Sequence, residues 1–190
     1  MASSLFQPGY LPSQMLGGKV FIGSTTYAGI AIPAYNATAQ VFGLWNPAGS
    51  GVNVILVKLN LAIATQGTQA QSALGLSYLP NTGNAIGASG APITAFTQTS
   101  SVPALIGDAA GAAAPSAARF TLSATIIAPT FFYDLAIGET AGTTPMGLTQ
   151  TEHDFDGAVG IAPGTYVGLG GSAAPGSTYQ ASLVWMEVPV

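Results

Sequence analysis

The sequence has 190 residues, which suits one domain or one domain with an arm. Only 5% of its residues are Asp, Glu, Lys or Arg, against about 25% in ordinary soluble domains, and only three are basic. Three basic side chains cannot form the electrostatic footprint that nucleic-acid binding needs, and an anionic membrane surface is disfavoured for the same reason. Cysteine is absent, which excludes disulfides, thiolate nucleophiles and cysteine-based metal sites.

The scarcity of charge favours a protein that associates with copies of itself. Repulsion between charged residues keeps monomers soluble and apart. In this chain neutral residues (Ser, Thr, Gln, Asn, Ala and Gly) take the place of the charged ones. The alternative is an extracellular protein with a neutral polar surface. The first eight residues contain neither a basic nor an apolar segment of the kind that a secretory signal has. We therefore expect synthesis and folding in a cytoplasm, and no stretch reaches the roughly 18 apolar residues of a membrane-spanning helix.

Residues 1–16 are predicted to be an extended N-terminal arm, and residues 17–190 a single β-sandwich domain. Proline and glycine interrupt the arm, yet it contains several large apolar side chains, namely Leu5, Phe6, Tyr10, Leu11, Met15 and Leu16. Such a segment lies either on a neighbouring subunit or back on its own domain. Deletion of 1–16 is expected to weaken attachment to an assembly more than it weakens folding.

Short runs rich in Val, Ile, Thr, Phe and Tyr between glycine and proline residues predict many short strands and no long helix. The stretch 81–118 is weakly patterned, and we expect a long loop with one or two short strands there. Eight to ten strands predict an all-β fold, a two-sheet antiparallel sandwich resembling a jelly roll. In chain order the predicted strands are 19–26, 30–32, 38–45, 52–64, 72–79, 119–128, 131–137, 155–161, 165–169 and 177–188.

The segment 52–64 carries the strongest strand pattern. Its apolar residues alternate with Lys58, Asn60 and alanines, which predicts one face in the core and one less buried. A turn cluster at 46–51 precedes it, so 38–64 is predicted to be a hairpin. The residues expected to share the core face are Ile55, Val57, Leu59, Leu61 and Ile63.

The last predicted strand, 177–188, is apolar on both faces. Tyr179 and Trp185 belong to one face, and Val184 and Met186 belong to the other. A strand of this kind is buried on both sides, either inside a sandwich or at a contact between subunits.

Two segments together resemble a group of tailed-bacteriophage virion proteins. The first is FGLWNPAGSGVNVILVKLNLAIA at 42–64, in which an aromatic strand leads to Asn-Pro-Ala-Gly-Ser-Gly at 46–51. The second is 162–190, which runs from Pro163-Gly164-Thr165 through a Gly/Ala loop to the closing strand ASLVWMEVP at 181–189. The resemblance covers the first predicted hairpin and the last quarter of the chain, and it consists of turn and strand motifs rather than catalytic ones.

The resemblance implies a jelly-roll subunit, commonly a homotrimer, on a phage particle. Capsid decoration (cement) proteins and head fibres are of this type, so the implied partners are further copies of the chain and the major capsid protein or another virion protein. The implied location is the virion, on the outer surface of the capsid or on the tail. The motifs do not separate a head protein from a tail protein.

The densest charged segment, 152–156 (Glu-His-Asp-Phe-Asp), contains the single histidine, His153. Carboxylates and an imidazole can hold a divalent ion, but the spacing matches no calcium loop. Just before a predicted strand, such a cluster is more often a solvated loop. We therefore assign no metal-binding residue and no cofactor, and ion binding by 152–156 stays open.

Catalytic motifs are not found in the sequence. A Ser-His-Asp triad would have to use His153, and no Gly-x-Ser-x-Gly turn accompanies it. Residues 168–173 fit the Gly-x-Gly-x-x-Ala pattern, but Pro175 follows where the dinucleotide-binding helix should begin. We predict that the chain is not an enzyme and assign no catalytic and no cofactor-binding residue. A hydrolase built on His153 or a carboxylate pair is the third hypothesis.

Aromatic residues allow two interpretations. They could form a platform for sugars, or they could fill the core and subunit contacts, which we favour because large aromatics supply much of the buried area in such places. The residues concerned are Tyr27, Tyr35, Trp45, Tyr78, Tyr133, Tyr166, Tyr179 and Trp185. The leading prediction is accordingly a non-enzymatic capsid decoration subunit, and the alternative is a receptor- or glycan-binding module of a phage fibre, a tail or a cell surface.

Overall fold

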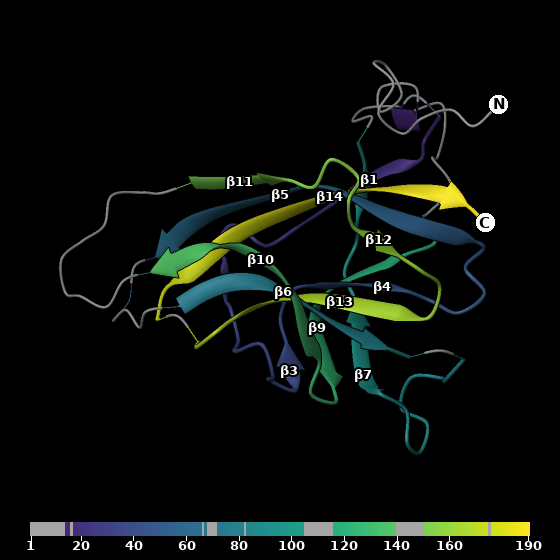
Figure 1. Ribbon diagram of the computed structural model, residues 1–190, viewed down its shortest axis with the longest axis horizontal. Coiled ribbons are helices and arrows are strands. Elements are labelled where there is room, and N and C mark those ends of the chain that lie inside the picture. Colours follow the sequence, from purple (N-terminus) through teal and green to yellow (C-terminus); the bar gives the residue numbers. More distant parts are fainter. Residues whose placement is uncertain are drawn as a thin grey trace.

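The computed structural model describes residues 14–15, 17–65, 67, 72–81, 83–104, 116–139, 150–174 and 176–190, without the side chains of 136–139 and 150. These residues form two antiparallel sheets that face each other (Figure 1). The prediction of an all-β, two-sheet antiparallel sandwich is confirmed. The predicted arm, 1–16, lies outside the described residues except for Gln14 and Met15.

Sheet A is built around the long strand β5. Its order is β11 (Gln150–Asp154), β5 (Val52–Thr65), β14 (Thr178–Pro189), β1 (Val20–Ser24) and β8 (Val102–Pro103). Two further strands join it, with β12 (Gly160–Ile161) paired to β5 and β2 (Ile30–Ala31) paired to β14.

Sheet B lies opposite sheet A. Its order is β10 (Thr130–Glu139), β6 (Ser72–Pro80), β13 (Thr165–Gly171), β4 (Gly43–Asn46), β9 (Arg119–Ile126) and β3 (Ala39–Gln40). The strand β7 (Ile93–Gln98) also pairs with β9. Fourteen strands are therefore seen within the described residues, more than the eight to ten that the sequence predicts, because several are only two residues long.

The strand order is that of a jelly roll. The strand pairs are nested along the chain. β1 pairs with β14 on the outside, and then, moving towards the middle of the chain, β4 pairs with β13, β5 with β11 and β6 with β10. A chain folded as one long antiparallel ribbon and rolled into two sheets gives this nesting. The strands β7, β8 and β9 are inserted between β6 and β10 and extend both sheets.

The main core fills the space between the sheets. Trp185 is fully buried there and stacks on Phe21 and Phe120, with ring centroids 6.0 and 6.3 Å apart. A second, smaller core lies on the other face of sheet B, since Trp45 and Tyr166 belong to it while their neighbours Leu44 and Val167 belong to the main core. The insertion covers this outer face of sheet B, and Ile93 of β7 is fully buried in the second core.

The predicted hairpin over 38–64 is wrong. The segment 43–46 belongs to sheet B and 52–65 belongs to sheet A, so the turn between them crosses from one sheet to the other. Strand β4 is buried at all four positions because each of its faces packs on one of the two cores, which places it inside sheet B. The buried Asn46 side chain fixes the crossing by donating to the carbonyls of Val52 and Ile161, each at 2.9 Å.

The predicted core face of 52–64 is correct only in its second half. Leu59, Leu61 and Ile63 are buried, but in the first half the buried residues are Val54 and Leu56. The pairing with β14 changes register between Lys58 and Leu56, which leaves Val57 as an extra residue in a bulge. The bulge reverses the alternation, so Ile55 and Val57 are half-buried on the other face.

The last predicted strand is confirmed as β14, a central strand of sheet A. Tyr179, Ala181, Leu183 and Trp185 all face the core and are at most 5% exposed. On the other face Val184 is half-buried and Met186 is buried, at 3% exposed.

Candidate functional site

The sequence predicted a solvated loop at the charged segment 152–156. This prediction is wrong for 152–154, which belong to a strand, and only 155–156 lie beyond the end of that strand. Glu152, His153 and Asp154 lie on β11, the edge strand of sheet A, where cross-strand pairing with β5 orders them. Glu152 accepts a hydrogen bond from Lys58 Nζ at 2.8 Å, and this bond raises the pKa of Lys58 above its usual value. Among the described residues, no group of three or more acidic or histidine side chains converges on one point.

His153 joins the edges of the two sheets. Its Nε2 lies 3.1 Å from the hydroxyl of Tyr133 on β10, and its ring packs against Phe155 at 4.8 Å between centroids. Tyr133 completes the cluster by packing on Phe155 at 5.6 Å. These contacts close the gap between β11 and β10, so they explain the histidine as a packing group at the edge of the sandwich.

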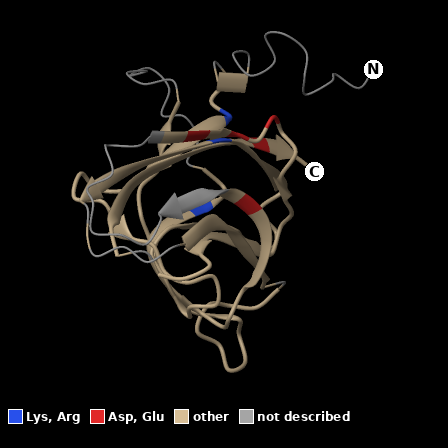
Figure 2. Cartoon of the chain, turned by 60° about the vertical axis from the view of Figure 1, so that its left-hand side comes forward, with Lys and Arg blue, Asp and Glu red and all other residues tan. Residues whose placement is uncertain are grey.

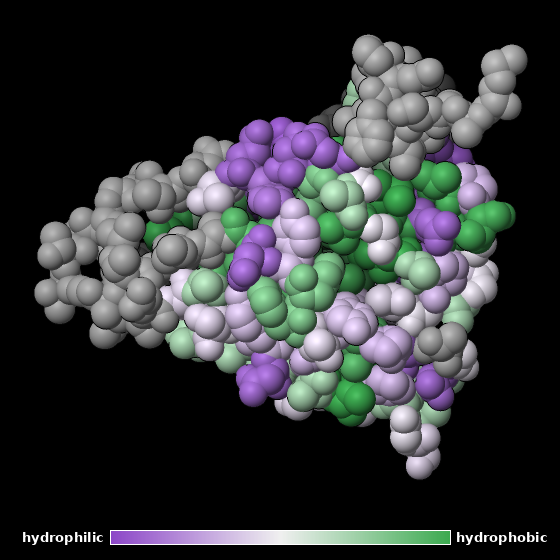
Figure 3. Space-filling view, in the orientation of Figure 1, coloured by the Kyte–Doolittle hydropathy of each residue, from purple (hydrophilic) through white to green (hydrophobic). Residues whose placement is uncertain are grey.

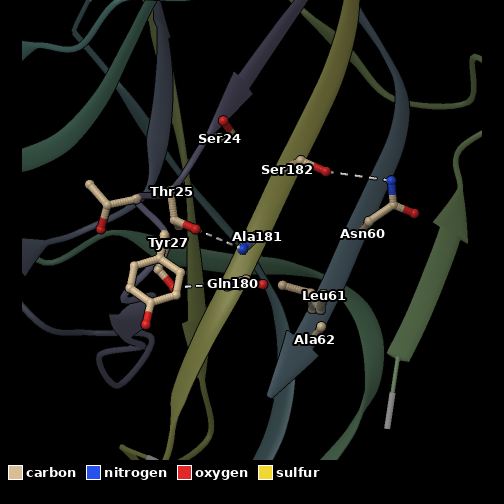
Figure 4. Close-up of a pocket in the computed structure, with 10 residues that line it drawn as sticks. Ser24, Thr25, Tyr27, Asn60, Leu61, Ala62, Gln180, Ala181 and Ser182 are labelled. Atoms are coloured by element: carbon tan, nitrogen blue, oxygen red, sulfur yellow. Dashed lines mark hydrogen bonds between the residues drawn. The ribbon is translucent and has the colours of Figure 1, made fainter. Parts of the chain in front are cut away.

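A polar groove of about 310 Å³ lies on the outer face of sheet A (Figure 4). Its floor is β14, one wall is the loop between β1 and β2, and the other wall is β5. The lining residues come from three separate parts of the chain and none of them is charged: Ser24, Thr25, Thr26, Tyr27, Asn60, Leu61, Ala62, Gln180, Ala181 and Ser182.

Hydrogen bonds hold the loop against the floor of this groove. Thr25 makes two hydrogen bonds with the backbone of Ala181. Its amide donates to the Ala181 carbonyl at 2.9 Å, and its Oγ1 accepts from the Ala181 amide at 3.1 Å. Gln180 Nε2 donates to the carbonyl of Tyr27 at 2.6 Å, and on the other side Asn60 Nδ2 lies 3.5 Å from Ser182 Oγ. The backbone of the loop is therefore fixed, while the side chain of Tyr27 stays 93% exposed.

A second surface is the free edge of sheet B. No described strand pairs with the outer side of β10, and its residues Phe131 and Phe132 are 40% and 38% exposed. Phe131 packs on Tyr35 at 4.5 Å between centroids, and Phe132 meets Tyr78 edge-on at 5.6 Å. We call Phe131, Phe132 and Tyr78 the β10 edge surface.

An apolar pocket of about 210 Å³ opens beside the β10 edge surface. It lies between the two sheets, since β12 supplies one side and strands β6 and β13 the other. Two residues of its lining, Tyr78 and Thr165, carry a side-chain hydroxyl. The others are Phe132, Val159, Gly160, Ile161 and Val167. A pocket of this composition suits an apolar side chain better than a polar ligand.

Four of the eight aromatic residues named from the sequence are core residues. Trp45, Tyr166, Tyr179 and Trp185 are buried in the two cores, where burial raises the pKa of Tyr166 above its usual value. Tyr27 stands at the polar groove. The sequence identified Tyr27 only as one of eight aromatics, and nothing in it indicated a groove built from three distant segments.

The surface carries few charges. Figure 2 shows that acidic and basic residues occupy only short stretches of the described ribbon. Figure 3 shows strongly hydrophilic residues in one group and a few isolated spots on the face in view, with pale and hydrophobic residues between them.

The segment with the Gly-x-Gly-x-x-Ala pattern does not open a helix. Residues 165–171 form β13, so the glycines of the pattern lie within a central strand of sheet B. Within the described residues, no helix is long and apolar enough to cross a membrane.

Comparisons of the chain with protein-family models, with curated proteins and with solved structures give no match.

Proposed function

We propose that the chain is a non-enzymatic structural subunit that packs against further copies of itself. The observation that carries the proposal is the β10 edge surface, where two half-exposed phenylalanines lie on a strand whose outer side has no described partner. An unpaired strand edge can pair with another chain, and proteins that remain monomeric commonly protect such edges with charged residues or proline. Pro129 precedes β10 and the exposed Asp134 lies on it, but near its start the strand presents Phe131 and Phe132 next to a pocket that suits an apolar side chain.

Burial of the β10 edge surface would stabilise a contact between subunits. Fully burying a phenylalanine side chain contributes about 1.5–3 kcal/mol, so covering the exposed two-fifths of Phe131 and of Phe132 contributes on the order of 1 kcal/mol each. The scarcity of charge removes the repulsion that would oppose contact between identical surfaces. Contributions of this size become sufficient when a closed ring of subunits repeats them at each contact.

The resemblance of 42–64 and 162–190 to tailed-phage virion proteins supports a more specific proposal. The subunit is a homotrimeric capsid decoration protein that contacts the major capsid protein or another virion protein and stabilises the particle. The jelly-roll strand order agrees with the fold that the resemblance implies. Mass spectrometry of purified particles from a phage that encodes this chain tests the location, and particles that lack the chain would contradict it.

Self-association is tested by light scattering of the purified full chain over a hundredfold range of concentration. We expect a stable oligomer for the native chain, and a shift towards monomer for the double variant Phe131→Ser, Phe132→Ser. The matched control is Ile127→Ser, which removes a side chain that is 51% exposed and lies outside the β10 edge surface. A native chain that stays monomeric, or a double variant that associates as the control does, would show the proposal to be wrong.

A further inference from the structure

We propose that the polar groove on the outer face of sheet A is a binding site for a neutral carbohydrate. The site lies between the β1–β2 loop and β5, and Tyr27 is its aromatic contact (Figure 4). The proposal does not depend on self-association, because the groove and the β10 edge surface share no residue.

The chemistry of the lining selects for a neutral ligand with many hydroxyl groups. Serine and threonine hydroxyls and the amides of Asn60 and Gln180 both donate and accept hydrogen bonds, as sugar hydroxyls do. The lining contains no charged residue, and the nearby Lys58 is paired with Glu152. A charged ligand would lose hydration without gaining a counter-charge, and an apolar ligand would leave the polar groups of the lining unpaired.

Tyr27 supplies the flat apolar surface that such a site needs. Tyr27 as a whole is 93% exposed, but its backbone is held by the bond from Gln180 and by a turn in which Gly29 N donates to the Thr26 carbonyl at 3.0 Å. Gly29 has φ = +74°, and a Cβ there would lie 2.8 Å from the carbonyl oxygen of Tyr179, so the turn requires glycine. The ring is therefore presented on a fixed loop, which lowers the entropy lost on binding.

Recognition at this site has to come from side chains rather than from strand addition. The floor strand β14 is paired with β5 on one side and with β1 and β2 on the other. Between the segments paired with β1 and β2, the backbone amide and carbonyl of Ala181 are both hydrogen-bonded to Thr25. An extended peptide would find no free backbone edge here, whereas a saccharide needs none. The volume of about 310 Å³ is at the lower end of the range for small-ligand sites, which suits a short saccharide.

The test measures binding of three probes to the full chain by saturation-transfer difference NMR and titration. Maltotetraose offers hydroxyls alone, chitotetraose adds acetamido groups, and 3′-sialyllactose carries a negative charge. We expect at least one neutral probe to bind and to show its strongest transfer at the protons that face Tyr27. The two neutral probes distinguish a hydroxyl-only ligand from an N-acetylated one.

Variants make the test specific to the groove. Tyr27→Ala should weaken binding about tenfold, because it removes the ring that covers the sugar, and Tyr27→Phe should keep most of the affinity. Ile127→Ala is the control, because this side chain is 51% exposed and lies outside both the groove and the β10 edge surface, and the variant should change binding less than about twofold. Failure of both neutral probes to bind, binding of the charged probe alone, or equal binding by Tyr27→Ala would each overturn the proposal.

Discussion

Replacement of Glu187 by alanine tests how the insertion is attached to the main sandwich. Among the acidic side chains that the structure describes, only Glu187 is buried, at 5% exposed. Its Oε1 accepts hydrogen bonds from Ser116 Oγ at 2.6 Å and from the amide of Ala118 at 2.9 Å, and its Oε2 accepts one from the amide of Ala117 at 3.1 Å. The carboxylate on β14 thus holds the segment that leads into β9.

The expected loss for Glu187→Ala follows from these bonds. The amide of Ala118, a residue only 1% exposed, would be left unpaired, which costs about 1–3 kcal/mol, and the loss of packing in the space left behind adds to it. The half-buried Ala117 regains part of its bond from water, and Ser116 Oγ can donate to the Ala118 carbonyl at 2.8 Å. We therefore expect the free energy of unfolding to fall by about 3 kcal/mol.

Urea unfolding at pH 7, followed by circular dichroism, measures this loss. Glu187→Gln keeps Oε1 and its two donors, so its loss should be smaller, about 1 kcal/mol. The control is Glu152→Ala, which removes an exposed ion pair with Lys58 and should leave the urea midpoint close to that of the native chain. If Glu187→Ala were as stable as the control, the segment before β9 would not depend on the carboxylate and the reasoning would be refuted.

Three further predictions concern buried positions. Gly23→Ala places a Cβ 2.6 Å from the Phe120 ring and should cost about 1–3 kcal/mol, whereas Gly160→Ala meets only ordinary contacts; equal urea midpoints for the two would contradict this. Asn46→Ala removes both donations across the turn and should cost about 2–3 kcal/mol in the same assay; an unchanged midpoint would show that the turn does not need them. Burial raises the pKa of Tyr166 above 10.0, so the unfolded chain loses this proton first as the pH rises. Stability should therefore fall above pH 10 by up to about 1.4 kcal/mol per pH unit, and Tyr166→Phe should fall less; parallel losses between pH 9 and pH 11 would refute it.

Local alternation was sufficient to predict most of the longer strands. The period-2 patterns of 119–128 and 177–188 correspond to β9 and β14, because alternate residues of each strand are buried in a core while most of the residues between them are less buried. Alternation also indicated a sandwich, since the chain has many such strands and no helical period. These features depend only on residues close together in the sequence, which is why the sequence shows them.

Features that depend on distant partners could not be predicted in this way. The turn at 46–51 has the composition of a hairpin turn, and only the two cores on either side of β4 show that it connects different sheets. The bulge at Val57 is set by the register with β14, more than 120 residues away in the chain. Edge strand β11 contains a charged cluster that reads as a loop, and its pairing with β5 makes it a strand.

The candidate sites, too, combine features that the local sequence shows with features that depend on distant parts of the chain. The aromatic residues could be named from the sequence, but their exposure is decided by which face of which strand they occupy. Tyr27 is exposed because it stands on a loop that leaves sheet A between β1 and β2, and Tyr166 is buried because the insertion covers its face of sheet B.

The jelly roll also separates the two proposed surfaces. The groove lies on the outer face of sheet A, over the central strand β14, while the β10 edge surface lies at one margin of sheet B. A contact made through β10 therefore leaves the floor of the groove in place, since β14 is held by β5, β1 and β2 within a single chain. Each copy in an oligomer then carries its own complete groove, and several weak saccharide contacts on one assembly can add up to firm attachment. Scarce charge agrees with both proposals, because identical surfaces with few charges repel each other little and an uncharged groove offers no counter-charge to an ionic ligand.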